Sequence, residues 1–585
     1  MRLSILGAAV VVALVAMGGP PAQASFHSKG PKISLGGMTC AVCTVITGMV
    51  DQLAVVHRED HKASFKRLCG IFPSPFSGFC SMFNLFYGSG ITRALANGET
   101  PDAVCLSNKM CSRPAAGQPT CHLFPEKSLK NKNSAEVNEY LDRLIVESGF
   151  PAPPADGRAI DFCSTPLIGS LACSFLNVHA FNIEYPEDDP DKDGFSDEFT
   201  FRGSAWRGKD CADTNVATYP GRRPSGNDDS RDSNCNGISG RNAETRRSLE
   251  DELCGNTGAK GVIALGDSVT ANFHIPGSWF NATIVTRDLY RNLSVLMENS
   301  FNWPHTSFYT GYQSVDWPII EGGTDSLYLR MRERNLCNHR DYQNIGFNGA
   351  TIPESTEYSQ SVKRNAQDKP AIAIFSYIGN DVCGYNADPA LDDTTTPEQA
   401  RAGLLDTMAV LNSKLPAGSH ALIVGVADAR PFFASLMDKI HPFGAVREDV
   451  TYLNFYEWLE CLDINPCKGW LTGDETIRAV TAQRVVNINN ELQRVVQEYQ
   501  HQFPNVEMVY IPNPVDDVLA AWLASGGESW QLVEAFDGFH PNQKAHQLVA
   551  EVLWNRLERD HPSVIGPINP NNDRIRELFG NQGGH

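Results

Sequence analysis

The sequence has little positive charge and, beyond its first residues, no long hydrophobic run. It carries 68 acidic against 49 basic residues, a formal net charge of -19. Nucleic-acid binding requires a basic face, so this deficit argues against a nucleic-acid partner, although local basic patches for a phosphorylated ligand are still allowed. No later stretch reaches the roughly 18 consecutive apolar residues of a spanning helix, so we expect no transmembrane segment in the mature chain.

The N-terminus has the pattern of a secretory signal. Arg2 precedes an apolar run from Leu3 to about Met17, and Ala22, Gln23 and Ala24 form a small-residue cleavage site. Residues 1–24 are therefore predicted to be a signal peptide, which implies secretion or residence in secretory or lysosomal-type vesicles. Sixteen cysteines and two glycosylation sequons agree with this oxidising route.

The length of 585 residues implies more than one domain, and six clustered cysteines mark the first. Cys40 and Cys43 are three residues apart, so on a helix they share one face and can bond to one partner segment. Apolar residues between the cysteines recur at helical spacing. Residues 36–115 thus resemble a saposin B-type domain. The resemblance implies the disulfides Cys40–Cys111, Cys43–Cys105 and Cys69–Cys80.

For this domain the resemblance implies a small helical clamp that takes lipid chains against its apolar inner face. From the pattern alone, a disulfide-stapled bundle whose apolar residues only fill its own core is favoured, because helical apolar stripes are more often core than ligand site. A lipid-cleaving enzyme on the same chain would reverse that preference. We then expect transient contact with a membrane or micelle through this domain.

Residues 116–180 are predicted to be a linker. The segment from Pro151 to Arg158 is rich in proline and contains a glycine and a basic residue, so it suits proteolytic cleavage, which we place near Arg158. If the chain is cut there, a disulfide must hold the parts together, and Cys121 is left over for it. The candidate pairs are Cys121 with Cys461 or Cys467, Cys163 with Cys173, and Cys337 with Cys383.

Residues 181–240 are predicted to form a calcium-binding module. A first loop offers alternate carboxylates, a turn glycine and a backbone carbonyl, from Asp189, Asp191, Asp193, Gly194, Phe195 and Asp197. An EF-hand has a bidentate glutamate at the twelfth place, where this chain has Thr200. The loop is therefore closer to the open calcium loops of thrombospondin type 3 repeats. A solvated acidic loop is the alternative.

A second acidic cluster surrounds a predicted local disulfide between Cys211 and Cys235. Only two sulfurs and no histidine are present, which argues against zinc and favours another hard cation. The candidate oxygen ligands are Asp210, Asp213, Asn215, Asp232, Asn234 and Asn236.

Residues 255–565 contain short apolar runs that end in turns, as the strands of a doubly wound α/β sheet do. The first run ends in a turn that carries Ser268. This serine is our candidate nucleophile, because a helix N-terminus that follows a strand favours the negative charge that develops during attack. Later turns present Gly349, Asn380 and the Asp537–His540 segment. Each turn alone has a plain structural explanation, but four such turns at one edge of a sheet are hard to credit to chance.

These four blocks, in this order, resemble those of the GDSL or SGNH hydrolases, whose sheet is parallel and flavodoxin-like. The resemblance implies that Ser268 attacks an ester, that His540 takes its proton, and that Asp537 orients the imidazole. The N–H groups of Ser268 and Gly349 and the side-chain amide of Asn380 would bind the oxyanion. Val269 replaces the family's usual leucine, at a position that packs rather than reacts.

Two long insertions separate the four blocks, one on each side of the Gly349–Asp381 region. Such insertions often form lids or acyl-chain grooves. His274 is either structural or substrate-facing. The aromatic residues that could line a groove, or pack the first insertion onto the sheet, are Trp303, Phe308, Tyr309, Tyr312 and Trp317.

Together the parts resemble the acyloxyacyl hydrolase family, including the run from Cys337 to Asn344 and the close of a C-terminal tail at 566–585. The resemblance implies a secreted serine esterase that removes secondary fatty acyl chains from the lipid A of bacterial lipopolysaccharide. It also implies calcium as the cofactor and two disulfide-linked chains after processing. The alternatives are a broad secreted phospholipase or acyltransferase, a non-catalytic lipid carrier, and a calcium-dependent interaction protein.

Overall fold

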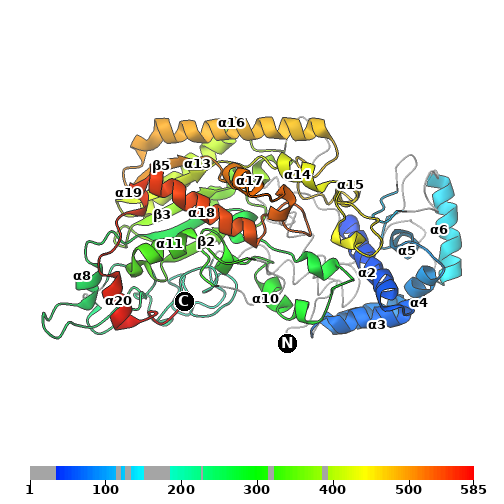
Figure 1. Cartoon of the computed structure of the whole chain (residues 1–585), viewed down its shortest axis with the longest axis horizontal. Coiled ribbons are helices and arrows are strands. Elements are labelled where there is room, and N and C mark those ends of the chain that lie inside the picture. Colours follow the sequence, from blue (N-terminus) through cyan, green and yellow to red (C-terminus); the bar gives the residue numbers. More distant parts are fainter. Residues whose placement is uncertain are drawn as a thin grey trace.

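The computed structural model describes residues 35–74, 76–112, 120–125, 134–149, 185–224, 228–313, 322–384 and 393–585. A small all-helical domain lies at one end of the molecule and a larger α/β domain at the other (Figure 1). This is the multidomain fold class that the sequence predicts. The predicted signal peptide, the cleavage point near Arg158 and the Cys163–Cys173 pair fall outside the described residues.

The helical domain begins with long helices joined by capped turns. Asp60 accepts a hydrogen bond from the N–H of Ala63 at 2.8 Å. Thr100 caps the helix Pro101–Ser107 in the same way, by accepting from the N–H of Ala103. The disulfides are Cys40–Cys111, Cys43–Cys105 and Cys69–Cys80, the nested pairing implied by the saposin resemblance. The helices are α2 (Leu35–His57), α3 (His61–Ile71), α4 (Phe76–Ala96), α5 (Pro101–Ser107) and α6 (Ser134–Ser148).

The prediction of a linker from residue 116 onward is wrong for residues 120–125 and 134–148. The buried carboxylate of Asp102 accepts hydrogen bonds from the N–H groups of Leu123 and Phe124, each at 2.9 Å. Helix α6 packs against α4 and α5. Its buried residues Val137, Leu141, Leu144 and Ile145 recur at helical spacing, which is the signal that indicates an amphipathic helix there.

One helix among the described residues, α2, is long and apolar enough to cross a membrane over Gly37–His57. However, 78% of its most apolar window is buried inside the molecule. Packing within the helical domain therefore accounts for the apolar character of α2.

The larger domain is built on a five-stranded parallel sheet with the order β2-β1-β3-β4-β5. The first four strands are buried throughout, which explains their continuous apolar runs. The strands are β1 (Gly261–Gly266), β2 (Tyr342–Gly346), β3 (Ala371–Ser376), β4 (Ser419–Val424) and β5 (Val506–Ile511).

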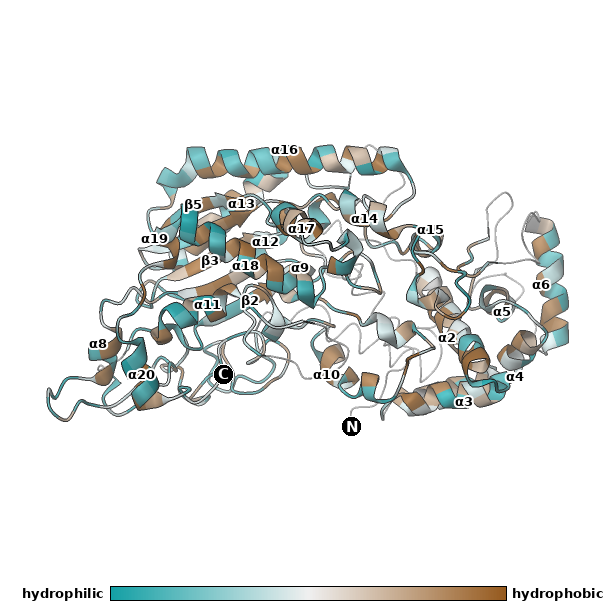
Figure 2. Cartoon of the chain, in the orientation of Figure 1, coloured by the Kyte–Doolittle hydropathy of each residue, from teal (hydrophilic) through white to brown (hydrophobic). Residues whose placement is uncertain are grey.

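Two groups of helices enclose the sheet. Helix α13 packs on both α12 and α16, α18 packs on both α11 and α17, and β1 contacts both α12 and α11. Figure 2 shows hydrophilic and hydrophobic residues alternating along α16, as expected for a helix with one buried face. The helices are α8 (Leu249–Cys254), α9 (Ser268–Ala271), α10 (Leu293–Glu298), α11 (Leu327–Arg334), α12 (Ser355–Ser359), α13 (Pro397–Lys414), α14 (Arg430–Leu436), α15 (Tyr452–Cys461), α16 (Glu475–Tyr499), α17 (Val515–Ala524), α18 (Gln543–Asp560), α19 (Pro562–Ile565) and α20 (Asn572–Phe579).

The predicted Cys337–Cys383 pair is wrong. Cys337 precedes β2 and bonds to Cys254, whereas Cys383 follows β3 and bonds to Cys467. In a parallel sheet, a residue before one strand and a residue after another lie at opposite ends of the strands, too far apart for a disulfide. The candidate pair Cys121–Cys461 is present and attaches the helical domain to the end of α15.

Candidate active site

The register of the sheet brings three of the predicted site residues to one edge. Gly266, the last residue of β1, lies opposite Gly346 of β2 and Ser376 of β3. All three strands therefore end at the same level. Ser268, Gly349 and Asn380 follow these ends within a few residues, so their turns leave the sheet side by side at its carboxyl edge.

A hydrogen-bonded chain joins Ser268, His540 and Asp537. Ser268 Oγ lies 2.8 Å from His540 Nε2, and His540 Nδ1 lies 2.6 Å from Asp537 Oδ2. Asp537 is fully buried, and the other two residues are at most 6% exposed. Because a carboxylate can only accept, His540 Nδ1 carries the proton, and Nε2 is left to accept from the serine hydroxyl. This arrangement suits transfer of the hydroxyl proton to the imidazole.

Asp267, the residue before the serine, ties the turn after β1 to the turn after β3. Its Oδ1 caps α9 by accepting from the N–H of Val269 at 3.0 Å. Its Oδ2 accepts from the N–H groups of Ile378 at 2.7 Å and Gly379 at 3.1 Å. Burial raises the pKa of Asp267, and these hydrogen bonds oppose that shift. The carboxylate thereby holds the Ser268 turn against the turn that carries Asn380.

The turns carrying Gly349 and Asn380 are also joined to each other. The side-chain amide of Asn380 donates to the carbonyl of Ala350 at 3.2 Å, directly after Gly349, whose φ is +78°. The buried carboxylate of Asp381 accepts from the N–H of Ile352 at 2.9 Å, and burial raises its pKa to about 7. The Asn380 amide and the glycine turn are thus neighbours, as an oxyanion-binding pair must be.

His274 belongs to a second buried pair next to the Ser268–His540 contact. Its Nδ1 lies 2.5 Å from Glu534 Oε1, and both side chains are less than 10% exposed. The N–H of Glu534 donates to the carbonyl of His540 at 2.8 Å. The structure therefore gives His274 a packed acidic partner that no sequence pattern signals, since Glu534 lies 260 positions further along the chain.

An apolar cavity opens beside these residues and encloses about 780 Å³ of empty space, including its open mouth. Val269, Gly379, Phe539 and Pro541, which are chain neighbours of Ser268, Asn380 and His540, contribute to its wall. Asn513 supplies a polar side chain, and the other described lining residues are apolar or glycine. The apolar lining of this cavity is compatible in chemistry with a hydrocarbon chain.

The aromatic residues of the first insertion divide between the two roles that the sequence left open, lining a groove and packing onto the sheet. Phe308 lines the cavity, whereas Trp303 and Tyr309 are buried in the core and Tyr312 is half-buried against it. Trp317 lies outside the described residues. The second insertion supplies more of the wall. Its part between β4 and α16 contributes Ala427, Ala429, Phe432 and Trp470.

The first acidic loop gathers carboxylates from two parts of the module. One oxygen each of Asp189, Asp191 and Asp193 lies within 4.8 Å of the others. Asp210 and Asp213 lie close enough to interact with them: burial, together with the charges of Asp189 and Asp191, raises the pKa of Asp210 to about 6 and that of Asp213 to about 7.

Several oxygens of this cluster are buried without a hydrogen-bond partner, namely Asp191 Oδ2, Asp193 Oδ2, Asp210 Oδ2 and Asp213 Oδ1. Phe195, two residues after Asp193, is buried, and its N–H donates to Asp193 Oδ1 at 2.9 Å. Asp197 is exposed. Buried, unpartnered carboxylate oxygens are costly unless a cation compensates them, so the residues fit a hard cation such as calcium.

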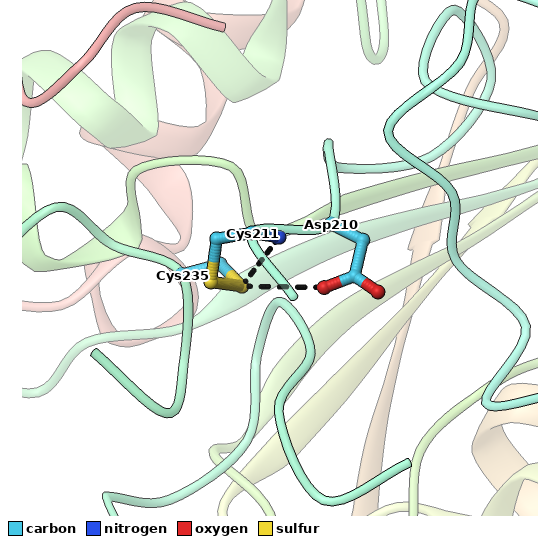
Figure 3. Close-up of side chains that lie close together, drawn as sticks. All are labelled: Asp210, Cys211 and Cys235. Carbon is cyan, nitrogen blue, oxygen red and sulfur yellow. Dashed lines mark hydrogen bonds between the residues drawn. A yellow bond between two sulfur atoms is a disulfide. The ribbon is translucent and has the colours of Figure 1, made fainter. Parts of the chain in front are cut away.

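In the second acidic cluster, Asp210 lies beside the disulfide and also reaches the first loop, because its N–H donates to the carbonyl of Ser196 at 3.1 Å. The side chain of Asn215 donates to Thr218 at 2.5 Å. Cys211 and Cys235 form a disulfide with Asp210 beside it, so these sulfurs are not thiolate ligands (Figure 3). Asp232, Asn234 and Asn236 form a loop of their own.

This second loop repeats the backbone of the first. Asp232 accepts from the N–H of Gly237 at 2.7 Å, as Asp189 does from Gly194 at 2.9 Å. The side-chain amides of Asn234 and Asn236 each donate to Glu250 at 2.9 Å. Sequence reasoning missed Glu250, which lies beyond the predicted module.

The fold and the site define a GDSL-type acyl hydrolase with an attached saposin-like domain. The family described as GDSL-like Lipase/Acylhydrolase matches residues 262–553, and the Saposin-like domain family matches residues 39–172.

Comparison with curated proteins identifies the family more closely. The acyloxyacyl hydrolase of Oryctolagus cuniculus is 37% identical over 551 residues, 94% of this chain and 93% of that protein. The acyloxyacyl hydrolase of Mus musculus is 37% identical over 552 residues, 94% of each chain, and that of Homo sapiens is 35% identical over 584 residues, 99% of each. The chain belongs to the acyloxyacyl hydrolase family and is an enzyme that removes acyl chains by ester hydrolysis.

Proposed function

We propose that this enzyme is a secreted serine esterase that cleaves the secondary, acyloxyacyl-linked fatty acyl chains of the lipid A of lipopolysaccharide. The observation that carries the proposal is the Ser268–His540–Asp537 chain beside an apolar cavity whose wall includes Val269, Phe539 and Pro541, the chain neighbours of Ser268 and His540. The family name supports the type of bond, an ester between one fatty acid and the hydroxyl of another acyl chain.

In the proposed reaction His540 Nε2 takes the proton of Ser268 Oγ as this oxygen attacks the ester carbonyl carbon. The carbonyl electron pair moves to its oxygen, which the N–H groups of Ser268 and Gly349 and the amide of Asn380 stabilise, each donor by about 3 kcal/mol. Collapse expels the hydroxyl oxygen of the remaining acyl chain, which takes the proton from His540. The acyl group stays on Ser268.

Deacylation repeats the same steps with water. His540 takes a proton from the water as its oxygen attacks the acyl carbon, and the fatty acid leaves when the proton returns to Ser268 Oγ. Asp537 keeps the imidazole oriented and stabilises its charged form in both halves. The released chain is the one in the cavity, where each buried methylene contributes about 0.8 kcal/mol of binding.

The test compares fatty-acid release from purified lipopolysaccharide and from phosphatidylcholine by the wild type and Ser268→Ala. Serine-dependent release of only the secondary chains of lipid A is the expected result. Comparable cleavage of phospholipid would instead favour a broad phospholipase, which the apolar lining of the cavity would also serve. Release that persists in Ser268→Ala would overturn the mechanism, and a serine-independent lipid carrier would then be the better description.

We also propose that the acidic module binds calcium. The proposed ligands are the carboxylates of Asp189, Asp191, Asp193, Asp197, Asp210 and Asp213 and the backbone carbonyl of Phe195. The buried, unpartnered oxygens support this proposal. The loop of Asp232, Asn234 and Asn236 is the second candidate cation site. Isothermal titration of the chelator-treated protein with calcium should show binding that Asp193→Asn abolishes. Unchanged binding in that variant would refute the ligand set.

We further propose that cleavage near Arg158 leaves two disulfide-linked chains. The Cys121–Cys461 bond spans 340 positions and would hold the parts together. Electrophoresis of the secreted protein should show one band without reductant and two with it. Two bands without reductant would contradict this arrangement.

A further inference from the structure

The loop that carries Asp537 and His540 is held from outside the sheet by the second insertion. We call residues 534–540 the catalytic loop and residues 440–462 the docking segment. Three successive carbonyls of the catalytic loop accept hydrogen bonds from side chains of the docking segment. They come from Tyr452 to Ala535 at 2.5 Å, from His441 to Phe536 at 2.7 Å, and from Tyr456 to Asp537 at 3.0 Å.

The three donors are built for this contact. His441 and Tyr456 are fully buried and Tyr452 is 5% exposed. His441 Nδ1 accepts from the N–H of Phe443 at 3.2 Å, so Nε2 carries the proton that is donated to Phe536. Burial lowers the pKa of His441 to about 3, which keeps the ring neutral and this tautomer in place.

The contact also explains a glycine of the catalytic loop. Gly538 has a φ of +63°, and a Cβ there would lie 2.2 Å from the hydroxyl of Tyr456. The loop therefore turns tightly under the tyrosine. Within the loop, the N–H of Gly538 donates to the carbonyl of Glu534 and the N–H of Glu534 to the carbonyl of His540, each at 2.8 Å. Fixing the three carbonyls consequently fixes the whole loop.

The same docking segment holds the saposin-like domain. Arg447 forms an ion pair with Asp51 of α2, and Cys461 forms the disulfide with Cys121. Residues 442–444, directly after His441, contact α2. Figure 1 shows α15 between α2 and the helices α14 and α17 of the α/β domain. One short segment thus contacts the saposin-like domain on one side and the catalytic loop on the other.

We propose that His441, Tyr452 and Tyr456 are positioning residues through which docking of the saposin-like domain sets the geometry of the catalytic loop. The inference rests on the proposed function of Ser268, His540 and Asp537. It implies that the saposin-like domain affects reaction at Ser268 even for a reagent too small to touch that domain. Lipid binding by the domain then has a route to the reacting groups that is separate from substrate delivery.

A short-chain fluorophosphonate provides the test, because it needs only the serine and its base. Ser268 Oγ bonds to phosphorus, fluoride leaves, and His540 takes the proton. The maximal labelling rate and the half-saturating concentration are measured for the full-length wild type, Tyr456→Phe, Arg447→Gln and the double variant. Tyr342→Phe is the matched control, since its buried hydroxyl donates to the carbonyl of Ser204 at 2.9 Å, away from the catalytic loop.

Loss of one hydrogen bond should lower the maximal labelling rate of Tyr456→Phe about fivefold, with the half-saturating concentration unchanged. Arg447→Gln should lower it about twofold, and the double variant less than the product of the two, because both changes act on one segment. Wild-type labelling of Arg447→Gln, or effects that multiply fully, would overturn the coupling. Labelling of Ser268→Ala would instead overturn the proposed function, so the two failures are distinguishable.

Discussion

Replacing Asp537 with asparagine should nearly abolish activity without disturbing the fold. Oδ1 of Asp537 accepts from the N–H groups of Phe539 at 2.8 Å and His540 at 3.0 Å, so the oxygen of an asparagine must take that place. Its NH₂ group then faces His540 Nδ1 and donates to it. His540 must carry its proton on Nε2, where it can no longer accept the proton of Ser268.

The wrong tautomer should lower kcat by about 10⁴-fold, or about 5 kcal/mol of transition-state stabilisation. The assay is release of fatty acid from lipopolysaccharide at saturating substrate, with thermal unfolding of the same preparation. Asp517→Asn is the control, because Asp517 is an exposed residue paired with Arg556. If Asp537→Asn kept more than a tenth of the wild-type kcat, the assignment of His540 as the base oriented by Asp537 would be refuted.

Three further predictions concern other parts of the molecule. Gly538→Ala should lower kcat at least tenfold and the melting temperature by several degrees, since the added Cβ meets Tyr456 and the positive φ costs about 1 kcal/mol; unchanged kinetics would contradict the close contact. Val518→Phe should weaken cleavage of long acyl chains about sixtyfold, because the ring fills the room of roughly three methylenes in the cavity. Chains a few carbons shorter should be spared, and equal loss for all lengths would exclude the cavity as the acyl site. Burial raises the pKa of Asp102 to about 7, above its value in the unfolded chain. Protonation of Asp102 in the folded state therefore stabilises the saposin-like domain at low pH, and this contribution is lost as pH rises from about 4 through 7. Asp102→Asn should flatten that part of the pH dependence of the unfolding free energy, and identical pH profiles for variant and wild type would disprove it.

Much of the candidate site could be predicted because its chemistry is local in the chain. Asp537 and His540 are three residues apart, so one loop brings them together whatever the rest of the fold does. Ser268, Gly349 and Asn380 each follow an apolar strand, and parallel strands must end at the same edge. The cysteine spacing of the saposin-like domain is similarly informative about the type of domain, whereas its disulfide pairing was implied by the resemblance to saposin B-type domains.

Other features depend on which strands are neighbours. The 2.8 Å contact between Ser268 and His540 joins residues 272 positions apart. Three more features follow from the positions of remote segments relative to one another. They are the arrangement of the acidic residues in two loops, the pairing of Cys337 with Cys254, and the part of the second insertion in the cavity wall. No spacing in the chain encodes them.

The sequence by itself determined the two folded domains, the residue types of the candidate site and the order in which they occur. Only the tertiary structure decided that the docking segment touches both the catalytic loop and the saposin-like domain, and that Val269, the residue after Ser268, lines an apolar cavity. The physical reason is that hydrophobic periodicity and turn chemistry act over a few residues. Distances between remote segments are set instead by strand order and by the packing of insertions against the sheet.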